Sequence, residues 1–442
     1  MEEVFSDRLG RDFARFSVPC VLNLLVFSLY TIVDGFFVSK YVGEAGLAAV
    51  NLSAPASYLL YSLGIAMAVG AGVLISTALG SGSGREADSL FTSNFCSTAL
   101  LGILLALLTL LFLDPICRLL GGEGAALTRE YLGVLAPFFP FVMLEYSLEF
   151  LVKINGSPRY SLWVIVSTCL FNVFGDWLLM GPFGMGLGGA ALATGISQFL
   201  TAALFFVKIV TNKEGTFRLD FSQLRPELLL PGRFLRLGVA DGSMELCNAL
   251  RAWLYNLLLL RMNGTDAVAA GSLVNYAATL CFNAATGIAQ GMEPLAAYHR
   301  GAERPAVLRR LLRLAFGTQL VCGFFCWGAA NLFTREFCAL FLEPSGGAFA
   351  MALPAVRRYS LAFLLLGCNV LSSAYLTAVQ QPGQALAVSL CRGFLLHGTL
   401  LVLFSLLLPD AFWHAAALTE LLTLFLSLRF LKKELERPFY AN

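Results

Sequence analysis

The sequence predicts an all-α integral membrane protein whose twelve transmembrane helices form two six-helix bundles related by a pseudo-twofold axis. Three observations support this fold class. The chain is 58% hydrophobic and only 13% charged, whereas soluble proteins carry roughly 25% charged residues. Long apolar runs alternate with short polar loops, which excludes a β-barrel because barrel strands alternate residue by residue. The second half of the chain also repeats features of the first.

Each apolar run is long enough to cross a bilayer as a helix, which takes about 20 residues. Proline and glycine punctuate the runs, and membrane helices tolerate both. No small-residue cleavage site follows the first run, so we expect no cleaved signal peptide. The expected spans cover residues 13–38, 47–78, 90–113, 130–153, 160–180, 187–209, 234–260, 266–296, 307–333, 352–378, 384–408 and 411–431.

The two halves of the chain resemble each other. The segment KYVGEAGLAAVNL at 40–52 lines up with RMNGTDAVAAGSL at 261–273, 221 positions further on. A parallel repeat of six plus six spans predicts two bundles related by an axis along the membrane normal, with a binding site in the cleft between them. A long polar loop near the middle divides the bundles. We therefore expect an N-terminal lobe at 1–209, an interlobe linker at 210–233 and a C-terminal lobe at 234–442.

The distribution of Lys and Arg predicts the orientation of the chain. These residues are about three times as frequent in the loops on the side of the N-terminus as in the loops on the other side. Positive loops stay in the cytoplasm. We expect a multi-pass protein of the plasma (inner) membrane with both termini and the linker in the cytoplasm. The net charge of only +2 gives no electrostatic support for binding nucleic acid.

Buried polar residues from three expected spans reach one depth in the membrane. Asn172 and Asp176 in the fifth span are one helical turn apart and share a face. With the N-terminus inside, these two residues, Asp34 in the first span and Thr194 in the sixth all fall in the outer half. Ala190 lies one turn from Thr194. An Asp near the centre of a membrane helix costs roughly 2.5–3.5 kcal/mol, so it is normally paired, hydrated or used.

Two carboxylates together with amide and hydroxyl oxygens form a ligand set for a hard cation. Oxygen ligands suit Na⁺, and a site of low dielectric favours proton binding by a carboxylate. A structural hydrogen-bond cluster is the alternative, although Ser or Asn would serve structure at a lower cost than two acids. We predict a site for H⁺ or Na⁺, with no other cofactor. Its Na⁺ ligands would be Asp34, Asn172, Asp176 and Thr194.

Other polar residues inside the spans are candidates for contacts in the cleft. Glu245 in the seventh span either faces the cleft, where it would contact a cationic ligand, or pairs with an Arg. Arg251 is six residues further on and therefore lies on a different face of the helix. The candidate cleft residues are Asn23, Tyr30, Glu145 and Glu245.

Two further pairs of polar residues have expected partners. Arg392 and His397 in the eleventh span indicate a packing network in the C-terminal lobe. A proton relay stays open as the alternative, because His titrates near neutral pH. Glu149 and Lys153 are one turn apart, and we expect them to pair at the cytoplasmic end of the fourth span.

Four stretches resemble the multidrug and toxic compound extrusion (MATE) family. They are YTIVDGFFVSKYVGEAGLAAV in the first span, FNVFGDWLL in the fifth, GGAALATGISQ in the sixth and GIAQGMEPLAAYHRGAERP at the end of the eighth. The resemblance covers nearly the whole chain and is closest to the bacterial branch with a cation site in the N-terminal lobe. It does not extend to a complete site in the C-terminal lobe, because the tenth span offers Asn369 and no acid, and Glu293 stands where the family usually has Gln. The cation-coupling residues that it implies are Asp34, Asn172, Asp176, Ala190 and Thr194.

The resemblance implies a secondary active antiporter and not an enzyme. Such a protein exports amphipathic or cationic drugs or metabolites in exchange for H⁺ or Na⁺, and its partners are these small molecules and the lipid bilayer. We expect a monomer. The chain has no Walker motif and is not itself an ATPase. One alternative is a lipid-linked oligosaccharide flippase of the same superfamily, for which the predicted cleft is too acidic. The other is a membrane-embedded enzyme, which would need clustered His residues, a GxSxG elbow or acids at metal-ligand spacing.

Overall fold

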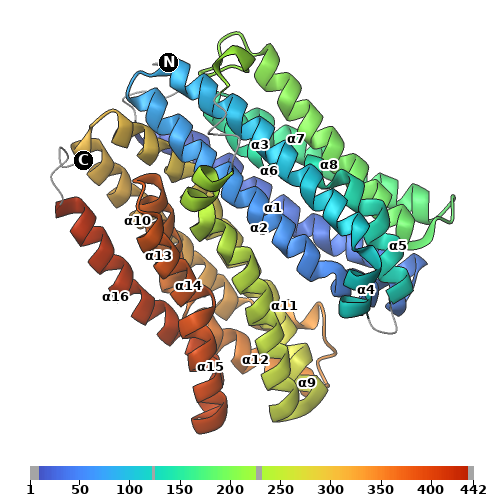
Figure 1. Cartoon of the computed structure of the whole chain (residues 1–442). Coiled ribbons are helices and arrows are strands. Elements are labelled where there is room, and N and C mark those ends of the chain that lie inside the picture. The colour runs from blue at the N-terminus through green and yellow to red at the C-terminus, as the bar shows by residue number, and fades with distance from the viewer. Residues whose placement is uncertain (1–8, 122–124, 225–230, 437–442) are drawn as a thin grey trace. The chain divides into compact units, whose positions relative to one another are not determined.

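The structure is a computed structural model that describes residues 9–121, 125–224 and 231–436, and none of these residues lies in a β-strand (Figure 1). Ten helices are long and apolar enough to cross a membrane, and a bent pair of helices provides an eleventh span. The first part of α9 is helical too but is not among these spans; it carries Asp241, Glu245 and Arg251. With this segment, the described residues supply the twelve predicted spans.

Six spans come from the first half of the chain. A short helix, α4 (Leu113–Gly121), follows the third span, and η3 (Phe221–Gln223) lies in the loop after the sixth. Helix α2 packs against α3 and α6, and α7 packs along α8 (Figure 1). The spans are α1 (Leu9–Tyr41), α2 (Glu44–Gly80), α3 (Gly84–Leu111), the combined segment α5 (Ala125–Leu135), η2 (Ala136–Phe138) and α6 (Phe139–Ile154), then α7 (Pro158–Met180) and α8 (Gly186–Thr211).

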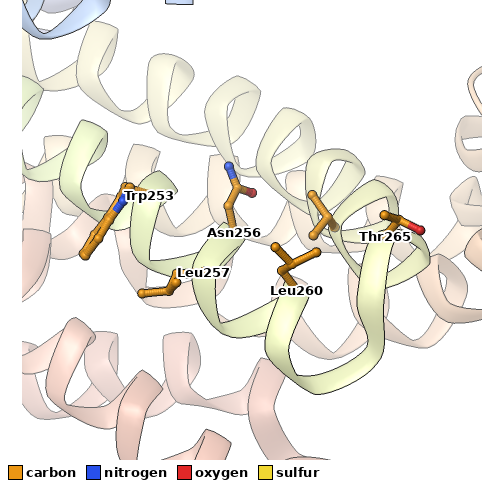
Figure 2. Close-up of a pocket in the computed structure, with 6 residues that line it drawn as sticks. Trp253, Asn256, Leu257, Leu260 and Thr265 are labelled. Carbon is orange, nitrogen blue, oxygen red and sulfur yellow. The ribbon is translucent and has the colours of Figure 1, made fainter. Parts of the chain in front are cut away.

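The second half repeats this order. Helix α9 (Gly232–Gly301) holds two spans, because the chain reverses at Gly264, where φ is +71°. Figure 2 shows the ribbon turning back between Leu260 and Thr265. Helices α12 and α13 form one span bent by 49°. The remaining elements are α10 (Pro305–Leu332), α11 (Thr334–Ala339), α12 (Gly347–Ser360), α13 (Phe363–Ala378), α14 (Pro382–Leu390), the π-helix η5 (Cys391–Leu395), α15 (Leu396–Leu407), η6 (Pro409–His414) and α16 (Ala415–Glu436).

The bounds of the elements reproduce the predicted repeat. Both ends of α10 lie 221 positions after the ends of α3, since α3 runs from 84 to 111 and α10 from 305 to 332. The turns that precede α2 and divide α9 fall at Gly43 and Gly264, with φ values of +85° and +71°. Glycine suits these positions because L side chains rarely adopt a positive φ. The repeat therefore extends to backbone conformation.

The offset grows in the last two spans of each half. Helices α7 and α14 begin at Pro158 and Pro382, a shift of 224. In the sixth span of each half, Ala190, Ala191 and Thr194 of α8 match Ala415, Ala416 and Thr419 of α16, a shift of 225. The C-terminal half thus has one residue more than the N-terminal half between these two points. The π-helix between α14 and α15 accommodates this residue, because a π-helical turn holds one residue more than an α-helical turn. Positions after η5 therefore correspond to N-terminal positions 225 residues earlier.

The described chain forms two compact units. The N unit comprises Leu22–Gly242, and the C unit comprises α1 up to Val21 and the chain from Ser243 onward. This division differs in two places from the lobe boundaries expected from loop polarity. The start of α1 belongs to the C unit, and the start of α9 belongs to the N unit.

Close approaches between helices explain why the start of α1 belongs to the C unit and the start of α9 to the N unit. A Cβ atom on Gly238 of α9 would collide with the backbone carbonyl of Ala66 on α2. In the C unit, a Cβ atom on Gly291 of α9 would collide with Ser17 on α1, and the Ser17 hydroxyl donates to the Ile288 carbonyl at 3.5 Å. These contacts require small residues, and they hold the start of each helix against its partner.

The first part of the predicted linker is docked on the N unit. The Asn155 side-chain oxygen accepts from the backbone N–H of Thr216 at 2.6 Å and of Phe217 at 3.3 Å. Asp88 accepts from the backbone N–H of Arg218 at 2.7 Å. This part of the linker is therefore an ordered extension of the N unit, and residues 225–230 lie outside the described residues.

Candidate cation site

The site in the N unit begins with a close contact between α7 and α8. A Cβ atom on Gly175 would lie only 3.1 Å from the Cβ of Ala193, so small residues on both helices allow this approach. The contact brings Asp176 of α7 beside Thr194 of α8. Asp176 is fully buried and Thr194 is 7% exposed.

Asn172 connects the two helices. With its amide oriented so that both polar ends are satisfied, Nδ2 donates to Asp176 Oδ2 at 3.1 Å and Oδ1 accepts from the backbone N–H of Thr194 at 3.2 Å. This arrangement fixes the orientation of the Asp176 carboxyl group. The one-turn spacing of Asn172 and Asp176 allows both to serve the same site.

Helix α1 delivers the second acid. The carboxyl groups of Asp34 and Asp176 lie within hydrogen-bonding reach of each other. Each also has one buried oxygen, Oδ1, with no hydrogen-bond partner among the described residues. An ionised carboxylate only accepts hydrogen bonds, so two carboxyl groups can bond to each other only when a proton lies between them. Two ionised carboxylates at this spacing would repel each other strongly in a buried site.

Tyrosines complete the surroundings. The Tyr30 hydroxyl, predicted to line the cleft, lies within hydrogen-bonding reach of the Thr194 side chain. Tyr131 of α5 is 8% exposed and close enough to Asp34 and Asp176 to interact with both electrostatically. Sequence reasoning missed Tyr131, because a tyrosine in an apolar run also suits a position at the membrane–water interface.

The structure thus brings four of the predicted cation residues together, and Ala190 lies buried on α8 one turn before Thr194. No group of three or more His, Cys, Asp or Glu among the described residues is placed to hold a metal ion. A Na⁺ ion would have to rely on two carboxylates and the neutral oxygens of Asn172 and Thr194. A shared proton needs only the contact between Asp34 and Asp176.

Asn23 contacts two polar residues of the N unit. It is 4% exposed, and its Nδ2 donates to Glu149 Oε1 and to Ser161 Oγ, both at 2.9 Å. Its amide nitrogen is therefore used inside the N unit, whereas its Oδ1 has no hydrogen-bond partner among the described residues, and its place in a substrate cleft stays a prediction. The predicted pair of Glu149 and Lys153 is confirmed, with Lys153 Nζ 2.6 Å from Glu149 Oε1.

The two acids predicted to line the cleft are partly exposed. Glu145 lies on α6 one turn before Glu149 and has no ion-pair partner among the described residues. Glu245 on α9 is close enough to Arg251 to feel its charge, but the guanidinium of Arg251 donates instead to Asn248 Oδ1 at 2.9 Å. That Glu145 and Glu245 line a substrate cleft stays a prediction.

The packing network predicted around Arg392 is present in the C unit, with a partner that sequence reasoning missed. Arg392 Nε lies 3.0 Å from Glu420 Oε1, and both residues are buried. Asn369 Nδ2 also donates to Glu420 Oε2 at 2.8 Å. His397 takes no part in this ion pair, since its Nε2 lies 3.0 Å from the Tyr255 hydroxyl. Glu420 could have been singled out from the sequence, because it is a lone acid within the twelfth apolar run.

An open pocket of about 360 Å³ lies where α9 reverses (Figure 2). Its lining is mostly apolar, with one amide, one hydroxyl and one indole N–H as its polar side-chain groups, so it offers no ligand set for an ion. The lining residues are Trp253, Asn256, Leu257, Leu260, Thr265 and Val268.

A repeated six-helix architecture with buried acids within its spans is typical of a multi-span membrane transporter. The family model described as MatE matches residues 19–178 and again residues 244–403. The chain therefore belongs to the MatE family, as the resemblance predicted. The same family unit therefore matches once in each half of the chain.

Relatives and solved structures extend this result. The multidrug export protein MepA of Staphylococcus aureus (strain NCTC 8325 / PS 47) is 26% identical over 420 residues, which cover 91% of each chain. A crystal structure of MATE in complex with MaL6 matches with a TM-score of 0.91 and 19% identity over 98% of both chains. The outward-facing conformation of a multidrug resistance MATE family transporter of the MOP superfamily matches with a TM-score of 0.91 and 18% identity over 98% of this chain and 97% of that one. These matches confirm the predicted fold, and they are to transporters and not to enzymes.

Proposed function

We propose that this protein is a secondary antiporter that exports amphipathic or cationic drugs or metabolites across the plasma membrane in exchange for H⁺. The relatives named as multidrug exporters support this substrate class over a lipid-linked oligosaccharide. One observation carries the choice of ion: the carboxyl groups of Asp34 and Asp176 lie within hydrogen-bonding reach of each other, and a single shared proton is enough to join them.

The same contact supplies a physical basis for coupling. Asp34 belongs to α1 and Asp176 to α7, so the contact persists only while these helices stay together. Loss of the proton would leave buried negative charge with unpartnered oxygens, which is costly away from water. The deprotonated protein would therefore favour an arrangement in which Asp34 and Asp176 separate. A proton that binds one arrangement more tightly than the other can drive exchange.

The proposed orientation gives the direction of exchange. The excess of Lys and Arg in the N-terminal and alternate loops supports cytoplasmic termini. Asp34, Asn172 and Asp176 would then lie in the outer half of the membrane, where a proton from outside reaches them first. The protein would work as a monomer in the bilayer.

The test is efflux of a fluorescent cationic dye from proteoliposomes, with a pH gradient and a Na⁺ gradient imposed separately. We expect the pH gradient to drive efflux and the Na⁺ gradient to add nothing at constant pH. Efflux driven by Na⁺ alone would overturn the choice of H⁺. Transport that responds to neither gradient would overturn antiport.

Asp34→Asn tests the site within the same assay. Asn keeps the shape of a protonated Asp but cannot change its charge, so gradient-driven efflux should be lost while equilibrium dye binding stays within a few-fold of wild type. Glu245→Gln in the C unit is the matched control, and we expect it to change affinity for a cationic dye more than coupling. Normal pumping by Asp34→Asn together with an inactive Glu245→Gln would place coupling in the other unit.

A further inference from the structure

The C unit has a counterpart of the cation site, and this counterpart holds no acid. At the offset of 221 found in the first spans, Asp34 corresponds to Tyr255; at the offset of 225 found after the π-helix, Asn172 corresponds to His397. The Tyr255 hydroxyl and His397 Nε2 lie 3.0 Å apart. A phenol and an imidazole thus occupy the place at which the N unit has an acid and an amide. At the same offset, Asp176 corresponds to Leu401.

A buried acid nevertheless lies nearby. Thr194 corresponds to Thr419, and the next residue is Glu420, which is 4% exposed. The Arg392 Nε atom lies 3.0 Å from Glu420 Oε1 and donates to Oε2 at 3.2 Å. The acid of the C unit is therefore already neutralised by a side chain of the same unit.

The surroundings hold both partners in place. Asn369 Nδ2 donates to Glu420 Oε2 and to the Glu420 backbone carbonyl, both at 2.8 Å, and Ser427 Oγ donates to Asn369 Oδ1 at 2.9 Å. The guanidinium carbon of Arg392 lies 5.2 Å from the centroid of the Phe282 ring. The carboxylate and the guanidinium are thus each fixed by a second neighbour.

Arg392 is a costly residue to place here. It is 2% exposed, and its Nη1 has no hydrogen-bond partner among the described residues. It also lies in the π-helix, where a Cβ atom on the neighbouring Gly393 would come within 2.7 Å of the Cys247 Cβ, so this turn packs directly on α9. An apolar side chain would fill the same volume without an unpaired N–H. What Arg392 adds is a permanent positive charge.

We propose that Arg392 is a fixed cation of the C unit. Its charge neutralises Glu420, in the way that an exchanged ion neutralises the acids of the N unit. Because Glu420 then needs no ion from solution, ion exchange is restricted to the N unit. A tethered guanidinium does not exchange with the solution on either side of the membrane, so no ion gradient can act through it. The consequence for coupling rests on the proposed function, whereas the role of Arg392 as a cation can be tested without transport.

The first experiment is chemical rescue of purified full-length protein. Asp34→Asn and Asp176→Asn serve as the background, so that the N unit offers no charged acid pair. In this background Arg392→Ala should lower the melting temperature by several degrees, and millimolar guanidinium chloride should restore much of the loss, whereas NaCl at the same ionic strength should not. Arg392→Ala combined with Glu420→Gln should show no guanidinium response. Equal responses of the two variants would overturn the proposal.

The second experiment measures the number of protons exchanged per substrate in proteoliposomes. Arg392→Met frees Glu420 to take up a proton, so this ratio should rise. Arg392→Met with Glu420→Met removes both charges and should transport at the wild-type ratio. A coupling defect in the double variant would overturn the proposal, as would an unchanged ratio in Arg392→Met. If wild-type protein shows no ion-driven transport, the proposed function fails, and the guanidinium result still decides the role of Arg392.

Discussion

The buried pair of Lys153 and Glu149 allows a quantitative test of how charge is held in the N unit. The Lys153 side chain is 3% exposed and that of Glu149 is 20% exposed, and their charged atoms are 2.6 Å apart. Lys153→Met keeps an unbranched apolar side chain of nearly the same length but removes the charge. Glu149 would then keep the donors Asn23 at 2.9 Å and Ser161 at 3.3 Å and lose its positive partner.

The expected loss of stability follows from this geometry. Removing one partner of a buried ion pair costs about 3–5 kcal/mol. The partial exposure of Glu149 and its two remaining donors place the loss near about 3 kcal/mol. An unfolding entropy of roughly 2.1 cal/mol/K per residue over 442 residues converts this loss to a fall of about 3 °C in Tm. If the N unit unfolds by itself, the fall is about twice as large.

Thermal unfolding of the purified protein, followed by tryptophan fluorescence, measures this effect. Lys153→Met combined with Glu149→Gln is the matched control, because it removes both charges and should recover most of the lost stability. A wild-type Tm for Lys153→Met would refute the reasoning, since Glu149 would then be hydrated well enough to need no partner. A double variant no more stable than the single one would refute it as well.

Two further predictions concern helix packing and the docked linker. Gly238→Leu should destabilise the N unit by about 1–3 kcal/mol or more, because a Cβ atom would collide with the Ala66 carbonyl; Gly317→Ala, with nothing within 4 Å, should instead gain about 0.5–1 kcal/mol. Equal Tm values for the two variants would contradict this. Asn155→Ala removes the acceptor for Thr216 and should speed protease cleavage within 212–224. An unchanged cleavage pattern would show that the other contacts hold the segment.

Most of the fold was predictable because a helix that crosses a bilayer needs a long run of apolar residues. Apolar runs gave the spans, and loop glycines gave the repeat, which the turns at Gly43 and Gly264 reproduce in backbone conformation. The boundaries of the units were harder to predict. Loop polarity marks where the chain leaves the membrane, whereas the assignment of Val21 and Gly242 depends on which helix each one contacts. Such contacts between distant segments leave little trace in local composition.

The candidate site shows the same limit at the level of side chains. Loop charges predicted one depth for Asp34 and Asp176, and helical spacing predicted which residues share a face, so these residues could be grouped from sequence. Helical spacing does not predict which residue of another helix each side chain contacts. Asn23 shares a face with Asp34, yet its amide bonds to Glu149. Glu420 is a single acid in an apolar run, and its pairing with Arg392 depends on how α16 packs against η5.

Helices α1 and α9 run through the boundary between the units without a break. Mechanically, α1 and the part of α9 before its reversal at Gly264 each act as a beam whose two ends belong to different units, so any rotation between the units would bend the helix at the boundary. Pro19 lies just before Val21 and lacks an N–H for the helical hydrogen bonds, and Gly242 lacks a Cβ atom. Pro19 and Gly242 are therefore the positions at which these helices bend most easily. Because Asp34 lies about four turns beyond Pro19, a small bend at Pro19 becomes a lever-arm displacement of the carboxylate.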